Sequence, residues 1–316
     1  MLKLLTVAVL LIIPYSVWAD SSLLWYRHFK WQEGVDGFSL PVIVGQGGWN
    51  FGKLLGGEEG VIYAVAGGDL LWYRHRGWDK GTPEFEGPQT VGHGGWDQFF
   101  QLISAGDGVL YGVRGSDLIW YQHIGWKEGS NVFAAPQTVG VGGWDQFKAI
   151  FSGGKGIIYA IQHSGDLLWY RHRHWQGAEG FDGPVVVGHG GWANYRRVFA
   201  GNDGVIYRTT ASGDLETVRH VGWNDGTDVW GTPAKIGYGG WNRFSHIFSG
   251  GGDGVIYAVA PASRGRCTCY SDEDARVFAE MDACSTAECL QHCEFASQVA
   301  GRPLASRYRE TAYCPK

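Results

Sequence analysis

The chain has 316 residues, of which 51 are Gly and 16 are Trp, and only 18% are charged. Its formal net charge of −5 gives no basic surface for nucleic acid and no attraction to an anionic membrane. Many glycines together with many aromatic residues indicate short strands joined by tight turns, in which each strand packs large rings.

Residues 1–19 are typical of a secretory signal peptide. A single cation at Lys3 precedes an apolar run from Leu4 to Ile13, and the small-residue exit Val17-Trp18-Ala19 comes after it. We therefore expect a secreted, extracellular protein whose mature chain begins near Asp20. The apolar run is shorter than the roughly 20 residues that a membrane helix needs, so we expect no direct membrane insertion.

Residues 20–262 are expected to form one domain made from a repeated unit. The tryptophans of a recurring Gly-Gly-Trp step are 47, 48, 48 and 49 residues apart, the length of a four-stranded propeller blade. The five copies of this step end at Trp49, Trp96, Trp144, Trp192 and Trp241. Each is followed by a Gly-x-x-Tyr segment, with its tyrosine at Tyr63, Tyr111, Tyr159, Tyr207 and Tyr257. A third segment, Asp-Leu-Leu-Trp-Tyr-Arg-His or a variant, ends at His28, His75, His123, His172 and His220.

Within one unit, four strands are predicted. The first strand is predicted around Phe99 to Ile103, and the second over Val109 to Val113. The third covers Leu118 to His123 and the fourth Pro136 to Val139. Glycine with Asp or Ser supplies the turns, as in Gly106-Asp107-Gly108.

The two ends of the repeat are incomplete in complementary ways. The mature chain begins at a third strand, Leu23 to His28, and the last unit stops after its second strand, Val255 to Val259. Together they make one blade, so we predict an all-β, five-bladed β-propeller that closes by pairing the chain ends. The alternative is a linear solenoid, which would need distinctive caps at both ends.

Residues 263–316 are predicted to form a small cysteine-rich domain. A cysteine cluster in an exported chain indicates a local disulfide framework, with all six cysteines as candidates: Cys267, Cys269, Cys284, Cys289, Cys293 and Cys314. Ser271 with Asp274 and Ser285 with Glu288 are helix-start signatures, and Gly301 suits the end of a second helix. We expect a helical C-terminal appendage with three internal bridges, or two and a pair available to another chain.

The repeat resembles the tachylectin family of five-bladed propeller lectins. The resemblance rests on Gly-Gly-Trp-x-x-Phe, a strand and Gly-x-x-Tyr, repeated at this period over residues 21 to about 260. It implies a multivalent lectin that binds N-acetylglucosamine and N-acetylgalactosamine (GlcNAc and GalNAc) between neighbouring blades without a metal or other cofactor. The Asp-Asn-Trp step of family members is replaced here by single aromatics such as Phe85 and Phe133.

The cysteine-rich tail departs from the plain lectins. A propeller lectin with such an extension resembles the lectin chain of the gastropod egg perivitellin toxins, which is disulfide-bonded to a pore-forming chain. This second resemblance implies a disulfide-linked, pore-forming partner and a role in targeting a toxin. A role in innate defence is the alternative.

A pyranose presents an apolar face and a rim of hydroxyls, so it is bound by a flat aromatic with donors and acceptors beside it. Tryptophans at three repeat positions, together with the polar residue after Gly-Gly-Trp, are the candidate carbohydrate-binding residues. In the Gly-Gly-Trp step they are Trp49, Asn50, Trp96, Asp97, Trp144, Asp145, Trp241 and Asn242. In the third strand they are Trp72, Trp120 and Trp169, with Trp25 as the equivalent copy. In a polar loop after that strand they are Trp31, Trp78, Trp126, Trp175 and Trp223.

Each of these sets also has a structural interpretation. Large rings can fill the space between blades, and the five repeated histidines can anchor neighbouring loops. In the fourth repeat, Glu216-Thr217-Val218 replaces Leu-Trp-Tyr. If the third-strand tryptophans line sites, fewer than five sites are then functional.

We expect no enzymatic activity and no metal site. No nucleophile with its base and orienting group stands out, and one histidine per repeat leaves no second ligand at metal spacing. The turn residues Glu59, Asp107, Lys155, Asp203 and Asp253 are interpreted as β-turns, because a calcium loop needs several carboxylates. An extracellular propeller that binds protein without sugar specificity is the alternative function.

Overall fold

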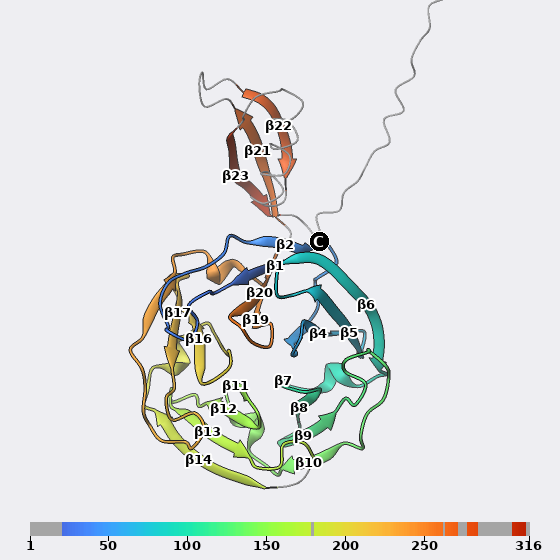
Figure 1. Ribbon diagram of the computed structural model, residues 1–316, viewed down its shortest axis with the longest axis vertical. Helices are drawn as coiled ribbons and strands as arrows, with labels where there is room; N and C mark the ends of the chain where they lie inside the picture. Colours follow the sequence, from blue (N-terminus) through green and yellow to red (C-terminus); the bar gives the residue numbers. More distant parts are fainter. Residues whose placement is uncertain (1–20, 178–179, 262, 271–276, 284–304, 314–316) are drawn as a thin grey trace, which may run out of the picture.

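The computed structural model describes residues 21–177, 180–261, 263–270, 277–283 and 305–313. Five four-stranded antiparallel sheets surround a common axis, as the face-on view in Figure 1 shows. The protein is a five-bladed β-propeller, which confirms the prediction from the repeat.

The blades are numbered here in chain order, with strands given from the axis outward. Blade 1 has β3 (Lys53–Gly56), β4 (Val61–Ala66), β5 (Asp69–Gly77) and β6 (Thr82–Gly92). Blade 2 has β7 (Gln101–Gly106), β8 (Val109–Arg114), β9 (Asp117–Gln122) and β10 (Gln137–Gly140). Blade 3 has β11 (Ala149–Gly154), β12 (Ile157–Ile161), β13 (Leu167–His172) and β14 (Phe181–Gly188). Blade 4 has β15 (Arg197–Ala200), β16 (Val205–Thr209), β17 (Leu215–Arg219) and β18 (Ala234–Gly237).

Blade 5 is built from both ends of the repeat. It has β19 (His246–Ser249), β20 (Val255–Ala260), β1 (Ser22–Arg27) and β2 (Val42–Gly45). Strand β1 pairs with β20 over its whole length, from Ser22 opposite Ala260 to Arg27 opposite Val255. The predicted composite blade is therefore confirmed, and this pairing closes the ring.

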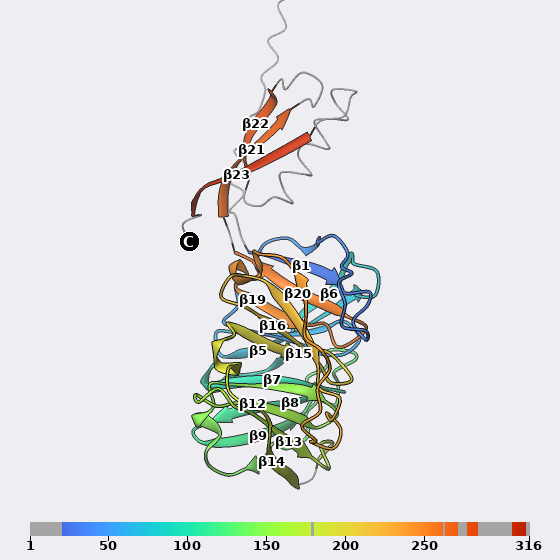
Figure 2. The same ribbon diagram turned by 90° about the vertical axis from the view of Figure 1, so that its left-hand side faces the viewer.

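The core lies between the blades. The innermost strands contact one another around the axis, and the side view in Figure 2 shows the blades stacked against their neighbours. Second strands are covered on both sides, so four of the five are nearly continuous apolar runs; Val61, Ile62, Tyr63 and Ala64 of β4 are almost completely buried.

The segment from one blade to the next differs from the predicted first strand. Residues Trp96–Gln98 form a short 3-10 helix (η1), and β7 begins only at Gln101. Three equivalent turns share the same pattern: η2 (Trp144–Gln146), η3 (Trp192–Asn194) and η4 (Trp241–Arg243). The glycine before η1, Gly95, has a φ of 80°, a conformation that costs glycine little, and this explains the Gly-Gly-Trp step.

The C-terminal appendage is not confirmed as helical. Strands β21 (Ser263–Tyr270), β22 (Val277–Ala283) and β23 (Ala305–Tyr313) form a three-stranded antiparallel sheet. Strand β22 takes residues that we expected in the first helix, since a Ser-x-x-Asp signature favours a helix start without determining the conformation of later residues. The second predicted helix falls within residues 284–304 and the signal peptide within residues 1–20, which lie outside the described residues.

Candidate functional site: the junctions between blades

The Gly-Gly-Trp tryptophans are packing residues. All five indoles are only 6–8% exposed, and four of them contact a tyrosine of the third strand at ring centroid distances of 4.9–5.0 Å. Trp96 also fits so closely against the preceding blade that a Cβ on Gly92 would come within 2.3 Å of its Nε1. These rings pack between neighbouring blades. This agrees with the structural interpretation, and not with direct sugar contact, for Trp49, Trp96, Trp144 and Trp241.

The third-strand tryptophans join each blade to the next. Trp25, Trp72, Trp120 and Trp169 are 0–4% exposed. Each indole donates a hydrogen bond of 2.7–2.8 Å to the backbone carbonyl of the loop tryptophan of the following blade: Trp78, Trp126, Trp175 and Trp223. Their burial leaves no ring face for a sugar, so we correct their expected role from direct sugar contact to holding the loop above.

The five repeated histidines form a second set of links between blades. Every one is fully buried, and its Nδ1 lies 2.7–3.0 Å from the hydroxyl of a second-strand tyrosine in a neighbouring blade. In four copies Nε2 lies 2.7–2.9 Å from a backbone carbonyl seven residues later. Nε2 therefore carries the proton, and Nδ1 accepts from the tyrosine hydroxyl.

This environment fixes the charge of these groups. Burial lowers the pKa of His28, His75, His123 and His220 below the ordinary value of 6.5, so the rings stay neutral at physiological pH. Burial also raises the pKa of the partner tyrosines far above 10, which keeps them as hydroxyl donors. The histidines thus anchor structure, as the structural interpretation held.

The loop tryptophans are the most accessible of the three sets. Trp31, Trp78, Trp175 and Trp223 are half-buried, and Trp126 is 8% exposed. Each rests on the glycine of the tight turn between the first two strands of its own blade; a Cβ on Gly108, for example, would lie 2.7 Å from Cδ1 of Trp126. A flat aromatic held on a rigid turn at the surface is a suitable platform for a sugar ring.

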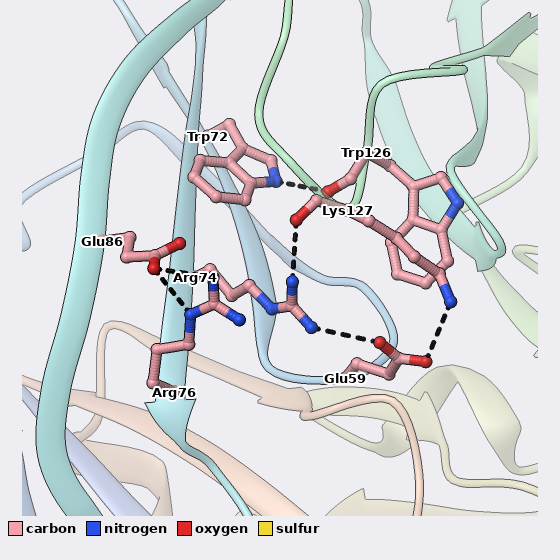
Figure 3. Close-up of polar contacts among 7 residues, drawn as sticks. All are labelled: Glu59, Trp72, Arg74, Arg76, Glu86, Trp126 and Lys127. Atoms are coloured by element: carbon pink, nitrogen blue, oxygen red, sulfur yellow. Dashed lines mark hydrogen bonds and ion pairs between the residues drawn. The ribbon is translucent and has the colours of Figure 1, made fainter.

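Figure 3 shows the polar groups beside one such loop, at the junction of blades 1 and 2. Arg74 donates from Nη1 to the carbonyl of Lys127 at 2.8 Å and pairs through Nη2 with Glu59 at 3.1 Å. Glu59 also accepts from Nζ of Lys127 at 3.2 Å, and that ammonium lies 5.0 Å from the centroid of the Trp126 ring. A pair formed by Arg76 and Glu86, 2.6 Å apart, lies further along β5 and β6.

The other junctions keep the geometry but change the side chains. Arg27 and Arg171 donate to the carbonyls of Asp79 and Asn224 in the next loop, as Arg74 does to Lys127. Gln122 and Arg219 donate instead to the turn carbonyls of Asp107 and Asp203. All five turn residues have φ between 47° and 55°, so the interpretation as tight turns is confirmed. The junctions therefore offer one platform with five different polar rims.

The polar residues after Gly-Gly-Trp lie elsewhere. Asn50, Asp97 and Asp145 are exposed and Asn242 is half-buried, in segments that lead from a fourth strand into the next blade. Those segments contact the hairpins between second and third strands, as in the bond from the Trp96 amide to the Gly68 carbonyl. The tryptophan loops come after third strands, at the opposite end of the blade. Sequence reasoning had combined residues from two ends of the propeller.

Two components of the junctions were missed from the sequence. The tyrosine–histidine bonds join residues about sixty or more positions apart, and the pairing of Glu59 with Arg74 and Lys127 joins two blades. The regular recurrence of Tyr and His in every repeat was the available signal, because a buried polar residue in each copy requires a partner in each copy.

No cluster of three or more potential metal ligands occurs among the residues that the structure describes. Within the same part of the chain, no helix has the length and apolar character needed to cross a bilayer. Five corresponding junctions on a closed ring make the protein a propeller with a repeated candidate site between its blades.

A scan against protein families matches the Tachylectin family over residues 20–183 and 182–297. These ranges cover most of the chain, and the protein belongs to the Tachylectin family. This membership points to a lectin-type, non-enzymatic protein that binds carbohydrate. A search of curated proteins finds no match.

Solved structures resemble the chain more distantly. One from a study entitled "The de novo evolutionary emergence of a symmetrical protein is shaped by folding constraints" has 20% identity and a TM-score of 0.46, covering 71% of this chain and 97% of its own. Yeast RCC1 (Prp20) bound to Kap60 has 12% identity and a TM-score of 0.35, with coverages of 74% and 58%. A plant lectin with two metal sites from Cicer arietinum has 11% identity and a TM-score of 0.31, with coverages of 58% and 93%. Since each TM-score is below 0.5, we rest the function on the family and the junctions.

Proposed function

We propose that the protein is a secreted multivalent lectin whose junctions bind GlcNAc and GalNAc. The observation that carries the proposal is the set of loop tryptophans, because four of these five residues are only half-buried and lie beside the donors and acceptors of two blades. A sugar would lie against the loop ring, with its hydroxyls directed at the junction groups. Several weak sites on one ring would raise avidity for a glycan-dense surface by about 10² to 10⁴.

The junction of blades 4 and 5 is proposed to be the weakest site. Its loop tryptophan is Trp31, and the position that holds an indole in the other blades is occupied by Thr217. The hydroxyl of Thr217 donates to the carbonyl of Ile206 within its own blade, so the Trp31 loop lacks this tether. We therefore still expect fewer than five strong sites. The reason is that the Trp31 loop is not held in place by an indole, and not that an indole in contact with the sugar is missing.

The test is titration calorimetry of the mature chain with GlcNAc and GalNAc. We expect fewer than five equivalents of sugar per chain, because the Trp31 loop lacks its tether and Trp126 is only 8% exposed, and one fewer in each of the variants Trp78→Ala and Trp175→Ala. Tyr238→Ala is the matched control, because Tyr238 is 72% exposed and lies in a segment that precedes a Gly-Gly-Trp tryptophan, away from the tryptophan loops. Five equal sites would refute the weakened junction.

A propeller that binds protein without sugar specificity is the competing function. It predicts no titration heat with either sugar, and no protein eluted by free GlcNAc from an acetylated-sugar resin. That result would overturn the lectin proposal, and a glycan array with the purified chain would give the same decision across many sugars. Turnover of a glycoside substrate would instead identify a hydrolase.

We further propose that residues 263–316 connect the propeller to a second chain through a disulfide. The propeller would then be the targeting part of a toxin or act in defence. The support is the confinement of all six cysteines to this segment, after 266 residues without one. Gel mobility of the secreted protein with and without reductant tests this. A monomer under both conditions would contradict a covalent partner.

A further inference from the structure

Blade 4 differs from the other blades at several positions of β16 and β17, and three of them, Arg208, Glu216 and Val218, fall on one face by register and strand alternation. Arg208 occupies the place of a small residue, which elsewhere is Ala64, Gly112, Ala160 and Ala258. Its register partner Glu216 occupies the place of an aliphatic residue, which elsewhere is Leu71, Ile119, Leu168 and Leu24. Val218 replaces the third-strand tyrosine that contacts the Gly-Gly-Trp ring in the sister blades.

The three changes together build a charged site beside Trp192. The guanidinium carbon of Arg208 lies 5.4 Å from the centroid of the Trp192 ring and 4.5 Å from that of Tyr195. Nε of Arg208 donates to Oε2 of Glu216 at 3.1 Å, and the two side chains are only 12% and 24% exposed. Largely buried ion pairs contribute little net stability, so packing alone gives no reason for this one.

A surface pocket lies beside Arg208. Its volume is about 360 Å³, within the range of small-ligand sites, and its walls are Trp192, Tyr195, Arg208, Thr210, Asn194 and the backbone of Gly190 and Gly191. In the sister blades a third-strand tyrosine contacts the Gly-Gly-Trp indole at 4.9–5.0 Å. In blade 4, where Val218 stands at that position, the Trp192 indole instead contacts the guanidinium of Arg208 and the ring of Trp230.

We propose that this pocket is a separate site for a sugar that carries a carboxylate, with Arg208 as its anion-binding group. Glu216 holds the Nε edge of the guanidinium, and no hydrogen bond to either Nη atom is found among the described residues. The free edge can bind a carboxylate through two parallel hydrogen bonds. The rings of Trp192 and Tyr195 fix the plane of the guanidinium and supply an apolar wall for the sugar.

The remaining groups suit the same ligand. Burial raises the pKa of Tyr195, and this outweighs the lowering by the nearby Arg208 charge; Glu216 also raises it, so the hydroxyl stays protonated. Thr210 and Asn194 add polar side chains of moderate size at the rim. The negative charge of Glu216 repels an anionic ligand, but its pairing with Nε of Arg208 offsets part of that repulsion. The two parallel hydrogen bonds to the guanidinium would then favour a carboxylate over a neutral sugar.

This site does not depend on the junction sites. It lies at the segment before the first strand of blade 4 and the hairpin between β16 and β17, whereas the tryptophan loops come after the third strands. The ligand classes differ as well, since the proposed junction ligands are neutral. The acid site can therefore fail while the lectin proposal stands, and the reverse also holds.

The test uses the mature chain with ¹⁵N-labelled tryptophan and monitors the indole signals during titration. The probes are N-acetylneuraminic acid, glucuronic acid and neutral GlcNAc. We expect one or both acids to shift the Trp192 signal with a stoichiometry of one, and the acid that binds more tightly identifies the class of sugar. GlcNAc should leave that signal unchanged.

Variants come from the sister blades. Arg208→Ala restores the residue found in three of them and is expected to weaken acid binding at least tenfold. The triple variant Arg208→Ala, Glu216→Leu, Val218→Tyr restores the sister packing, should unfold at the same temperature or higher, and should abolish acid binding without changing GlcNAc stoichiometry. Unchanged acid affinity in either variant, absence of binding by both acids, or a GlcNAc shift as large as that of the acids would overturn the proposal.

Discussion

The hydroxyl of Tyr63 in blade 1 lies 2.9 Å from Nδ1 of His123 in blade 2. Four further bonds of the same kind complete the circuit, so every blade is tied to the next by one buried tyrosine and one buried histidine. Each histidine also stacks on an aromatic of its own blade at 4.4–4.8 Å, which holds the ring in the plane that the bond requires.

Removal of one tyrosine hydroxyl should destabilise the whole ring. Tyr63→Phe leaves Nδ1 of His123 buried without a donor, and we expect a loss of about 1–3 kcal/mol in the free energy of unfolding. Urea denaturation measures this, with Tyr238→Phe as the control because Tyr238 is exposed. An equal effect of both substitutions would show that the buried bond carries no special weight.

Stability should fall as the pH drops through the histidine range. The pKa of His28, His75, His123 and His220 is lowered in the folded state, mainly by burial, so the unfolded chain binds protons first. The stabilisation is present above about pH 6.5 and is lost as the pH falls toward the folded pKa values. Thermal melts between pH 8 and pH 5 should show a falling transition temperature. A flat profile would contradict the neutral-histidine assignment.

The titration of Glu58 should change stability with pH in the direction opposite to that of the histidines. Burial, with repulsion from Asp107 as the second cause, raises its pKa to about 7 in the folded state. The folded chain then binds the proton more tightly than the unfolded chain, so this contribution is full below about pH 4.5 and is lost as the pH rises through 7. Glu58→Gln should therefore stabilise the protein at pH 8 by about 1 kcal/mol, a value discounted for solvent screening.

The adjacent residue supplies the control for this substitution. Glu59 pairs with Arg74 and Lys127, so Glu59→Gln should lower stability slightly at the same pH. Denaturant titrations of both variants at pH 5 and pH 8 separate the two cases. Destabilisation by Glu58→Gln at pH 8 would mean that its carboxylate has a favourable partner.

The missing indole in blade 4 gives a reciprocal pair of substitutions. Trp169→Thr removes a ring that is 3% exposed together with its bond to the Trp223 carbonyl, and we expect a loss of about 3–5 kcal/mol. Thr217→Trp places an indole against Gly34, where a Cβ would lie 3.8 Å from Cγ2 of Thr217, and should add about 1 kcal/mol. Calorimetric unfolding measures both; no gain from Thr217→Trp would mean that blade 4 cannot accept the tether.

The repeat period was sufficient to predict five blades and the composite closure. Such prediction succeeds because each unit must bury its faces against identical neighbours, so the pattern encodes both the strand and its surroundings. The first strand was placed too early because Gly-Gly-Trp-x-x-Phe continues into a 3-10 turn that no apolar alternation marks. The appendage was harder to predict, since its short segments show no period.

The site was only partly predictable. Repetition identified the tryptophans, and local sequence placed Trp72 in a strand and Trp78 in a polar loop, but the sequence did not show that the Trp72 indole is buried under the loop of the next blade. Arg208 gave no signal from its own segment, because its significance comes from Glu216 and Val218 on the neighbouring strand. The contacts that form both proposed sites join different strands and blades, so the sequence of a single repeat does not predict them.

The pairing of β1 with β20 imposes an order on biosynthesis. Strand β1 leaves the ribosome first, but its inner neighbour emerges only after more than two hundred further residues. Until then a strand rich in Leu, Trp and Tyr has an open edge, at the time when exposed edges pair most easily with the wrong partner. The molecule therefore acquires its ring in a single late event, and a nascent chain arrested before residue 255 should be a substrate for chaperones.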